Sequence, residues 1–354
     1  MAVSVKPKDV NELLPTEIVF QTEYWAQVKG RLGWSPCAYD IQGASSANDL
    51  LVLVRPLGDN LFGAFVPQGP EFAPDQEHYG SYLESLSESI AGKLGSGVAF
   101  IRYDLPWLSP YADALENNPE PGFPNVRSRE MRMNIGTQRW NFRKAPLDMT
   151  VAHSLVVDIR GSENRILGRM KSKTRYNIGL ALRKGIRVFR AEADQLPQFH
   201  ELYEETAARN GFTSGDERYF SALFSTENGE DGRSEAVLLL AAHGPDVLAG
   251  AIVTITGNYA YFLHGASSDR KRHLMASYAL HWEAMRYARS RHCLVYDMGA
   301  VAPADFSDHE FYGLYRFKTG FGGRIVHRAG SWDFPLDDTA YSAFRNHEVL
   351  QSLG

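Results

Sequence analysis

Apolar and polar positions in the first half of the chain predict two strands, a helix and a third strand, in that order. Residues 50–57 and 61–70 are apolar runs on either side of a turn at 58–60, which is typical of a β-hairpin. An apolar strand over 98–106 is predicted to close the unit and to end at Tyr103-Asp104. Between them, apolar side chains recur at the three- and four-residue intervals of a helix: Tyr79, Tyr82, Leu83, Leu86 and Ile90.

The second half of the chain repeats this order. Apolar runs at 234–243, 247–255 and 259–267 predict strands, with a turn between the first two. A last strand over 292–299 ends at Tyr296-Asp297. The helix before it has one apolar face: Met275, Tyr278, Ala279, Trp282 and Met285. We infer two copies of one α/β unit.

The order strand–strand–helix–strand resembles the fold of the GNAT acyltransferases. Those enzymes hold the pyrophosphate of coenzyme A on a glycine-rich turn at the start of the central helix. The corresponding stretches here, 268–273 and 74–77, contain no glycine, so the backbone could not approach a pyrophosphate closely. The scaffold therefore indicates acyl transfer from an activated donor other than coenzyme A.

These patterns predict an α/β (α+β) fold with two tandem GNAT-like domains. The first covers 1–154, the second covers 155–330, and a closing strand and helix at 331–354 complete the first. Residues 115–130 are rich in asparagine, proline and acidic side chains and are predicted to form a surface loop. No sustained heptad pattern occurs, so we expect no coiled-coil arm.

Composition narrows the setting of the protein. The chain has 354 residues, of which 44% are hydrophobic and 22% charged, so two globular cores can be filled. No apolar run reaches the roughly 18–20 residues of a membrane-spanning helix, and the N-terminal residues lack the apolar core of a signal peptide. The two cysteines give neither a disulfide framework nor zinc-ligand spacing. We therefore expect a cytoplasmic protein without a transmembrane segment.

Positive charge is concentrated in one segment. The net charge of −5 excludes a generally basic nucleic-acid binder, yet residues 160–190 hold ten Lys or Arg and one acid, Glu163. Ser172 can cap a helix there and Gly185 can end it. Cations in a first helical turn oppose the helix dipole unless an anion docks, which favours a phosphate site over a merely solvated helix face. The first turn carries three cations, Lys171, Lys173 and Arg175.

Two lysines are candidate binding or catalytic residues. Residues 312–323, YGLYRFKTGFGG, place four aromatic residues around Lys318 and three glycines after it. A lysine in a rigid, partly apolar loop could stabilise an oxyanion or a phosphate; a β-bulge with an exposed lysine is the alternative. Lys29 lies one helical turn after Trp25 in a predicted short helix, where a solvated charge is the simpler interpretation.

Three further polar residues lie at predicted strand ends. Asp104 and Asp297 could orient an attacking amine or accept its proton, although a helix cap or an ion pair would explain them equally well. His264 could line a polar pocket, or could be a core histidine with satisfied hydrogen bonds. No triad order, reactive-cysteine context, P-loop or metal-ligand spacing occurs, so we expect no covalent nucleophile, no metal and no cofactor.

Several long motifs, in order along most of the chain, resemble the FemABX family of peptidoglycan cross-bridge aminoacyltransferases. They are residues 65–72, 100–106, 170–186, 265–288, 295–301 and 311–323. The resemblance implies two GNAT-like domains that face a cleft, and an enzyme that moves an amino acid from aminoacyl-tRNA to the side-chain amine of a stem peptide. The acceptor would be UDP-MurNAc-peptide or lipid II. Peripheral contact with the inner face of the membrane is compatible with the second of these.

The resemblance also implies roles for individual residues. Lys29 would contact the diphosphate of the acceptor. Phe317 and Lys318 match the Phe-Lys pair of the family, whose lysine is tied to the tRNA end and to transition-state charge. Asp104 matches an acidic position and would hold the attacking amine. Acceptor or tRNA contacts are further expected from a set of substrate-binding residues: Tyr103, Lys173, Arg175, Tyr176, His264 and Tyr315.

The sequence departs from the family pattern at two places. His264 stands where a tyrosine is expected before Gly-Ala-Ser, and residues 133–153 lack the usual Q-P-R-x-T type of sequence. These departures concern the acceptor more than the fold. Two alternatives therefore stay open: tRNA-dependent aminoacylation of an acceptor other than peptidoglycan, and a GNAT-fold protein that binds wall precursors without catalysis.

Overall fold

The computed structural model describes residues 3–43, 48–58, 60–117, 124–226 and 234–352. Contacts between residues divide the chain into two compact units. The first unit comprises residues 1–152 and 326–354, and the second comprises residues 153–325. The sequence analysis places these junctions at 154/155 and 330/331. Within the described residues, no helix combines the length and the apolar character needed to cross a membrane.

The first unit is built on a sheet with the strand order β1-β2-β3-β4-β5-β13, and β6 pairs with β13. Neighbouring strands are antiparallel except β4 and β5, which are parallel and are joined through α2. The strands are β1 (Ser4–Lys8), β2 (Ser35–Gln42), β3 (Asn48–Gly58), β4 (Leu61–Val66), β5 (Val98–Leu108), β6 (Arg143–Lys144) and β13 (Arg324–Pro335). The helices are α1 (Glu23–Arg31), α2 (Tyr79–Ala91), α3 (Ala112–Asn117), α4 (Val126–Asn134) and α11 (Asp338–Ser352).

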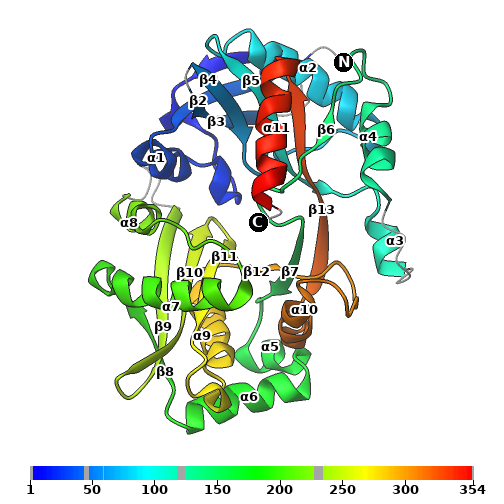
Figure 1. Cartoon of the computed structure of the whole chain (residues 1–354). Helices are drawn as coiled ribbons and strands as arrows, with labels where there is room; N and C mark the ends of the chain where they lie inside the picture. The colour runs from blue at the N-terminus through cyan, green and yellow to red at the C-terminus, as the bar shows by residue number, and fades with distance from the viewer. Residues whose placement is uncertain (1–2, 44–47, 59, 118–123, 227–233, 353–354) are drawn as a thin grey trace. The chain divides into compact units, whose positions relative to one another are not determined.

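Helices cover both faces of the sheet in the first unit. Leu83, Leu86 and Ile90 of α2 pack on one face against Ile101 and Tyr103 of β5. Successive side chains of a strand point to opposite faces, so the residue between them, Arg102, faces the other way. There it meets α11, which crosses the strands in Figure 1 and returns the end of the chain to the first unit.

The second unit has the strand order β7-β12-β11-β10-β9-β8, and β11 and β12 are its parallel pair. Its strands are β7 (His153–Asp158), β8 (Arg187–Ala191), β9 (Ser234–His243), β10 (Asp246–Thr256), β11 (Tyr259–Ser267) and β12 (Val295–Ala300). Its helices are α5 (Glu163–Arg169), α6 (Ser172–Arg183), α7 (Leu196–Asn210), α8 (Glu217–Ser225), α9 (Ala276–Ser290) and α10 (Tyr312–Lys318). As predicted, a hairpin, a crossover helix and a parallel strand occur in both units.

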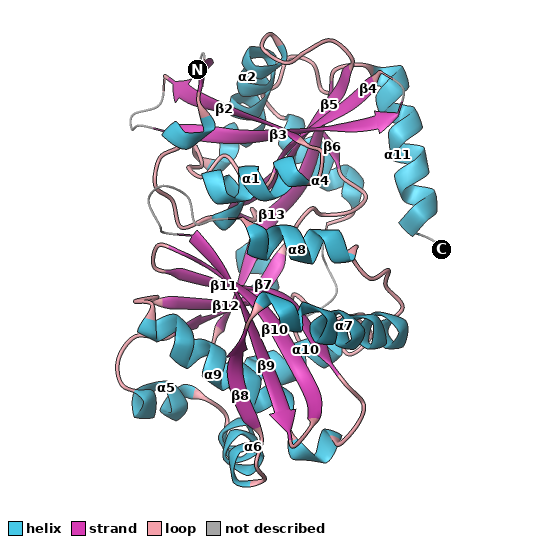
Figure 2. Cartoon of the chain, turned by 90° about the vertical axis from the view of Figure 1, so that its left-hand side faces the viewer, coloured by secondary structure: helices cyan, strands magenta, loops and turns pink. Residues whose placement is uncertain are grey.

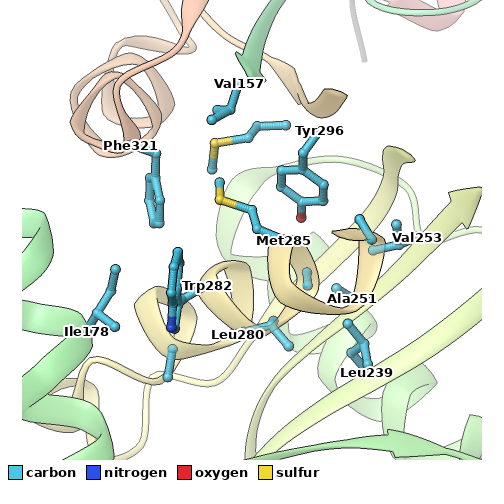
Figure 3. Close-up of a cluster of buried hydrophobic side chains, with 14 of the residues drawn as sticks. Val157, Ile178, Leu239, Ala251, Val253, Leu280, Trp282, Met285, Tyr296 and Phe321 are labelled. Atoms are coloured by element: carbon cyan, nitrogen blue, oxygen red, sulfur yellow. The ribbon is translucent and has the colours of Figure 1, made fainter. Parts of the chain in front are cut away.

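The core of the second unit lies between its sheet, α6 and α9. In Figure 3, Trp282 of α9 lies next to Phe321, and Met285 lies next to Tyr296 of β12. On the opposite face of the sheet, the ring of Phe199 of α7 packs on Gly250, where an added Cβ would lie 2.7 Å from it. Figure 2 shows α7 and α9 on the two sides of these strands.

Four local expectations differ from the structure. Residues 126–134 form α4 instead of a loop, because the Asn125 side chain accepts a hydrogen bond from the Ser128 N–H (2.9 Å) and caps the helix. Residues 312–318 form α10 instead of a loop. Asp104 and Asp297 lie inside their strands, since β5 and β12 continue past them. Lys171 is the N-cap of α6, so Ser172 begins that helix, and Asp59 of the predicted hairpin turn lies outside the described residues.

Candidate functional site

Lys318 is the last residue of α10 and is buried, with 4% of its surface exposed. Its Nζ donates a hydrogen bond to the Ala300 carbonyl at the end of β12 (2.7 Å). Gly299, the residue before Ala300, has a φ of 71°, which suits glycine, and a Cβ there would lie 3.3 Å from the Phe262 carbonyl oxygen. Among the residues that the structure describes, backbone and ring contacts hold the lysine, and no carboxylate lies at hydrogen-bond distance from its Nζ.

The charge of Lys318 is poorly solvated. Burial lowers the pKa of Lys318 to about 7, and only the charge of Asp297 acts in the opposite direction. The Asp297 carboxylate is itself fully buried and accepts hydrogen bonds from Ser154 (3.0 Å), Tyr259 (2.8 Å) and the Gly299 N–H (2.8 Å). The Phe262 ring lies 5.7 Å from the Lys318 Nζ. Lys318 therefore loses its proton more readily than a solvated lysine does.

Aromatic side chains surround this lysine. Phe317 packs edge-on against Tyr278 (4.9 Å between ring centroids) and against Phe321 (5.4 Å). His281 of α9 is buried next to Phe317, and its Nδ1 lies 3.1 Å from the Tyr296 hydroxyl. Burial, and secondarily the charge of Lys318, lowers the pKa of His281 to about 3, so its ring is neutral. Sequence reasoning missed His281; its place in the apolar stripe of α9, one residue before Trp282, was the available signal.

Tyr315 lies on α10, one turn before Thr319, the residue that follows the helix, and it is half-buried. Its ring stacks on Tyr312 with an interplanar angle of 11°. Burial raises the pKa of the Tyr315 hydroxyl. Its substrate-binding role stays a prediction.

The basic helix α6 begins against the segment that follows Lys318. The Lys171 N–H donates to the Gly320 carbonyl (2.8 Å), and Thr174 packs on Gly320 so closely that a Cβ there would lie 2.2 Å from the Thr174 hydroxyl. Lys173 and Tyr176 are exposed, and the exposed Arg175 donates to the Met170 carbonyl. The structure therefore brings two predicted elements, the α6 N-terminus and the Lys318 segment, into contact.

His264 lies on β11 among rings from α7 and α8. Its Nε2 is 3.1 Å from the Tyr219 hydroxyl and its Nδ1 is 3.4 Å from the Tyr203 hydroxyl. The Phe220 ring is perpendicular to the imidazole at 5.3 Å. These contacts provide hydrogen-bond partners for both ring nitrogens, and a pocket role for His264 stays a prediction.

In the first unit, Lys29 of α1 lies in an aromatic cradle. Its Nζ is 5.0 Å from the ring centroids of both Trp25 and Trp34. Arg55 packs on Trp34 as well (5.1 Å). Burial, and secondarily the charge of Arg55, lowers the pKa of Lys29 to about 8. Two cations held together on aromatic rings are suited to a polyanion such as a diphosphate.

Asp104 and Tyr103 lie on opposite faces of the first-unit sheet. The Asp104 carboxylate is buried and accepts from Ser331 (2.7 Å) and Thr150 (2.5 Å). Burial raises the pKa of Asp104, against the effect of these two hydroxyls. Tyr103 is fully buried, and its hydroxyl lies 2.9 Å from the Ser87 hydroxyl of α2. Both contact sets are internal to the first unit.

Comparisons with known proteins agree with this fold and with the motifs. A model of the FemAB family matches residues 15–231 and 225–348. Among curated proteins, the chain is similar to a lipid II:glycine glycyltransferase of Staphylococcus haemolyticus, with 24% identity over 250 residues, which is 53% of this chain and 59% of that protein. The protein of that name from Staphylococcus epidermidis is 24% identical over 289 residues, 65% of this chain and 66% of its own length. The chain thus matches about three-fifths of the length of these relatives.

Solved structures give the same architecture. The crystal structure of FemX has a TM-score of 0.70 with 18% identity and covers 95% of this chain and 96% of its own. A tandem GNAT protein from the clavulanic acid biosynthesis pathway has a TM-score of 0.52 with 12% identity, covering 94% of this chain and 98% of its own. At these identities the likeness establishes the fold, and it confirms the tandem GNAT-like prediction.

Proposed function

The chain belongs to the FemAB family, and from that membership we propose that it transfers an aminoacyl group to a lipid-linked peptidoglycan precursor in the synthesis of cross-bridges. The names of its relatives, lipid II:glycine glycyltransferases, support lipid II as the acceptor, in preference to a UDP-linked precursor. The proposed donor is aminoacyl-tRNA, and the proposed nucleophile is the side-chain amine of the stem peptide. The proposed setting is the cytoplasmic side of the membrane.

The reaction is the aminolysis of an ester. The neutral amine attacks the aminoacyl carbonyl, negative charge develops on the carbonyl oxygen, and the bond to the ribose oxygen breaks as the amide forms. The amine loses a proton, and the departing ribose hydroxyl gains one. The chain must therefore position two substrates and stabilise an oxyanion, and neither task requires a covalent enzyme intermediate.

The observation that carries the proposal is the state of Lys318. A cation held in a nearly dry site, by the Ala300 carbonyl and an aromatic wall, interacts with a developing oxyanion more strongly than a solvated one would. Its pKa near 7 also lets it exchange a proton at neutral pH. Phe317, the preceding residue, packs on Tyr278 and His281 and so fixes the end of α10.

The remaining residues receive narrower proposed roles. Lys29 and Arg55 would bind the acceptor diphosphate, and Lys173, Arg175 and Tyr176 would contact substrate phosphate or peptide. Asp104 would hold the attacking amine through the remaining lone pairs of its two oxygens, each of which already accepts one hydroxyl hydrogen bond.

The test is a transfer assay with a panel of acceptors. The protein is incubated with charged tRNA and with lipid II, UDP-MurNAc-peptide or a peptide with a free N-terminus, and the products are identified by mass spectrometry. Transfer to lipid II that is lost in Lys318→Met and kept in Lys93→Met, a control at an exposed lysine with no proposed role, supports the proposal. Saturable precursor binding without transfer would identify a binder instead, and transfer only to the peptide would replace the acceptor class.

A further inference from the structure

Helix α4 of the first unit makes polar contacts on its inward face and exposes apolar side chains on its outward face. Its inward face buries Met133 and Asn134, and its single acid, Glu130, accepts a hydrogen bond from the Lys144 N–H of β6 (2.9 Å). Asn134 bridges the helix to the Phe142 backbone, donating to its carbonyl and accepting from its N–H (3.0 Å each). These contacts hold the helix against the first unit, and its one carboxylate, that of Glu130, is engaged in an inward hydrogen bond.

The outward face of α4 mixes apolar and cationic side chains. Met131 is 54% exposed and Ile135, which caps the helix, is 60% exposed. Arg127 and Arg132 flank them on the helix surface and are exposed as well. Exposed apolar side chains bordered by arginine can contact both the acyl region and the phosphates of an anionic membrane surface.

A hollow beside α4 adds a place for an anionic group. It lies between α4, the start of α2 and the end of β5 and is open to solvent. Arg129 and Arg132 line it together with Tyr79 and Tyr111, and the Arg132 guanidinium stacks on the Tyr111 ring at 5.5 Å. Burial lowers the pKa of Arg129, and the charges of Asp148 and Tyr111 act in the opposite direction, so Arg129 already interacts within the first unit. Arginine pairs are well shaped for phosphate oxygens.

The charge of this region contrasts with that of the chain. Residues 126–143 contain five arginines (127, 129, 132, 139 and 143) and one acid, Glu130, whereas the whole protein carries a net charge of −5. Local attraction to an anionic surface can therefore coexist with overall repulsion, which orients the protein with α4 toward that surface.

We propose that α4 is a docking surface for an anionic phospholipid bilayer, with Met131 and Ile135 inserted at the interface and lipid phosphates bound by the exposed Arg127 and Arg132. The proposal deepens the proposed function, since a lipid-linked acceptor places the reaction at such a surface. Binding through α4 would raise the local concentration of the protein at the membrane without a transmembrane segment.

The test is vesicle flotation with the full chain. Wild-type protein should float with phosphatidylcholine vesicles that contain phosphatidylglycerol, float less with phosphatidylcholine alone, and be released by salt. Arg127→Glu with Arg132→Glu should weaken binding at least about tenfold, because each basic residue near an anionic surface contributes severalfold. Met131→Gln with Ile135→Gln should weaken vesicle binding at low salt and at high salt alike, since salt does not screen the apolar contribution of these two side chains.

A matched control comes from the second unit. Leu294→Gln with Arg187→Glu also removes one exposed apolar and one exposed cationic side chain, and should float like wild type. Equal melting temperatures would verify that the α4 variants fold. Transfer to a water-soluble acceptor should be unchanged in the α4 variants, while transfer to lipid II in vesicles should fall.

Three results would overturn the proposal: no flotation of the wild type, equal flotation of the α4 variants and wild type, or loss of tRNA binding in the α4 variants without loss of flotation. The last would make α4 a nucleic-acid surface. Because flotation requires no turnover, a failure of the transfer assay would refute the proposed function and leave this inference to be judged by the vesicles alone.

Discussion

Removal of the buried amine by Lys318→Met should make the protein more stable at pH 6 and should abolish one pH-dependent component of its stability. In the folded chain the pKa of Lys318 is about 7, against 10.5 for an unperturbed lysine. Below pH 7 the folded protein holds a poorly solvated charge that the unfolded chain exposes to water, which costs folding free energy. Methionine has a similar shape and no charge to desolvate.

The magnitude follows from the two pKa values. Their difference, 10.5 minus about 7, is about 3.5 units, which corresponds to about 5 kcal/mol as an upper figure for an almost fully buried group. Between pH 7 and 10.5 the unfolded chain binds a proton that the folded chain does not. Stability from this group therefore rises with pH across that window and is lost as the pH falls toward 7.

Urea unfolding at a series of pH values between 6 and 9 measures this effect. Other groups titrate in the same range, so the informative quantity is the difference in unfolding free energy between wild type and Lys318→Met. That difference should favour the variant most at pH 6 and should shrink by a few kcal/mol toward pH 9. A difference that stays constant with pH would show that Lys318 does not titrate near neutrality, and the proposed electrostatics of the site would be refuted.

Three further outcomes are expected. Lys318→Met should lower kcat by about 10²-fold, the scale for loss of one oxyanion donor. The kcat of the wild type divided by that of Lys318→Arg should fall above pH 7, since arginine keeps its charge; a ratio that does not change with pH would exclude a catalytic cation. Lys29→Met should raise KM for the acceptor more than Arg31→Met does. The affinity of the wild type for the acceptor should decline as the pH rises through about 8, where Lys29 loses its proton. If isothermal titration calorimetry gave Lys29→Met the same acceptor affinity as the wild type, Lys29 would have no part in phosphate binding. Arg102→Met should cost about 3–5 kcal/mol of stability by leaving the buried Asp333 carboxylate without its cationic partner. A loss of unfolding free energy under about 1 kcal/mol, measured by urea unfolding, would contradict this.

Elements with a clear hydrophobic period were predictable, because that period records burial on one face. The stripes around Leu83 and Trp282 became α2 and α9, and the apolar runs on either side became paired strands. Two copies of the same order then indicated a tandem architecture, which the structural comparisons confirm. Local sequence was sufficient here since propensity, pattern and packing agree.

Two helices formed where the sequence indicated a loop. The sequence of α10 is rich in aromatic residues and glycine and has no side-chain N-cap, so local preference favours a loop. Packing of Phe317 and Phe321 on α9 supplies the stabilisation that propensity lacks. The sequence of α4 has an N-cap at Asn125 but few apolar positions to mark an inward face, because polar residues, Glu130 and Asn134, make its internal contacts.

The sequence by itself determined the order of elements, the family and the identity of the candidate lysines, because these depend on the residues in a local stretch of chain. Only the tertiary structure decided the contacts, the burial and the pKa of those lysines. Lys318 is bonded to Ala300, 18 positions away, and lies near His281 of α9 and Asp297 of β12. Its pKa depends on how far folding removes it from water, and desolvation is a property of the packed three-dimensional surroundings that no local motif encodes.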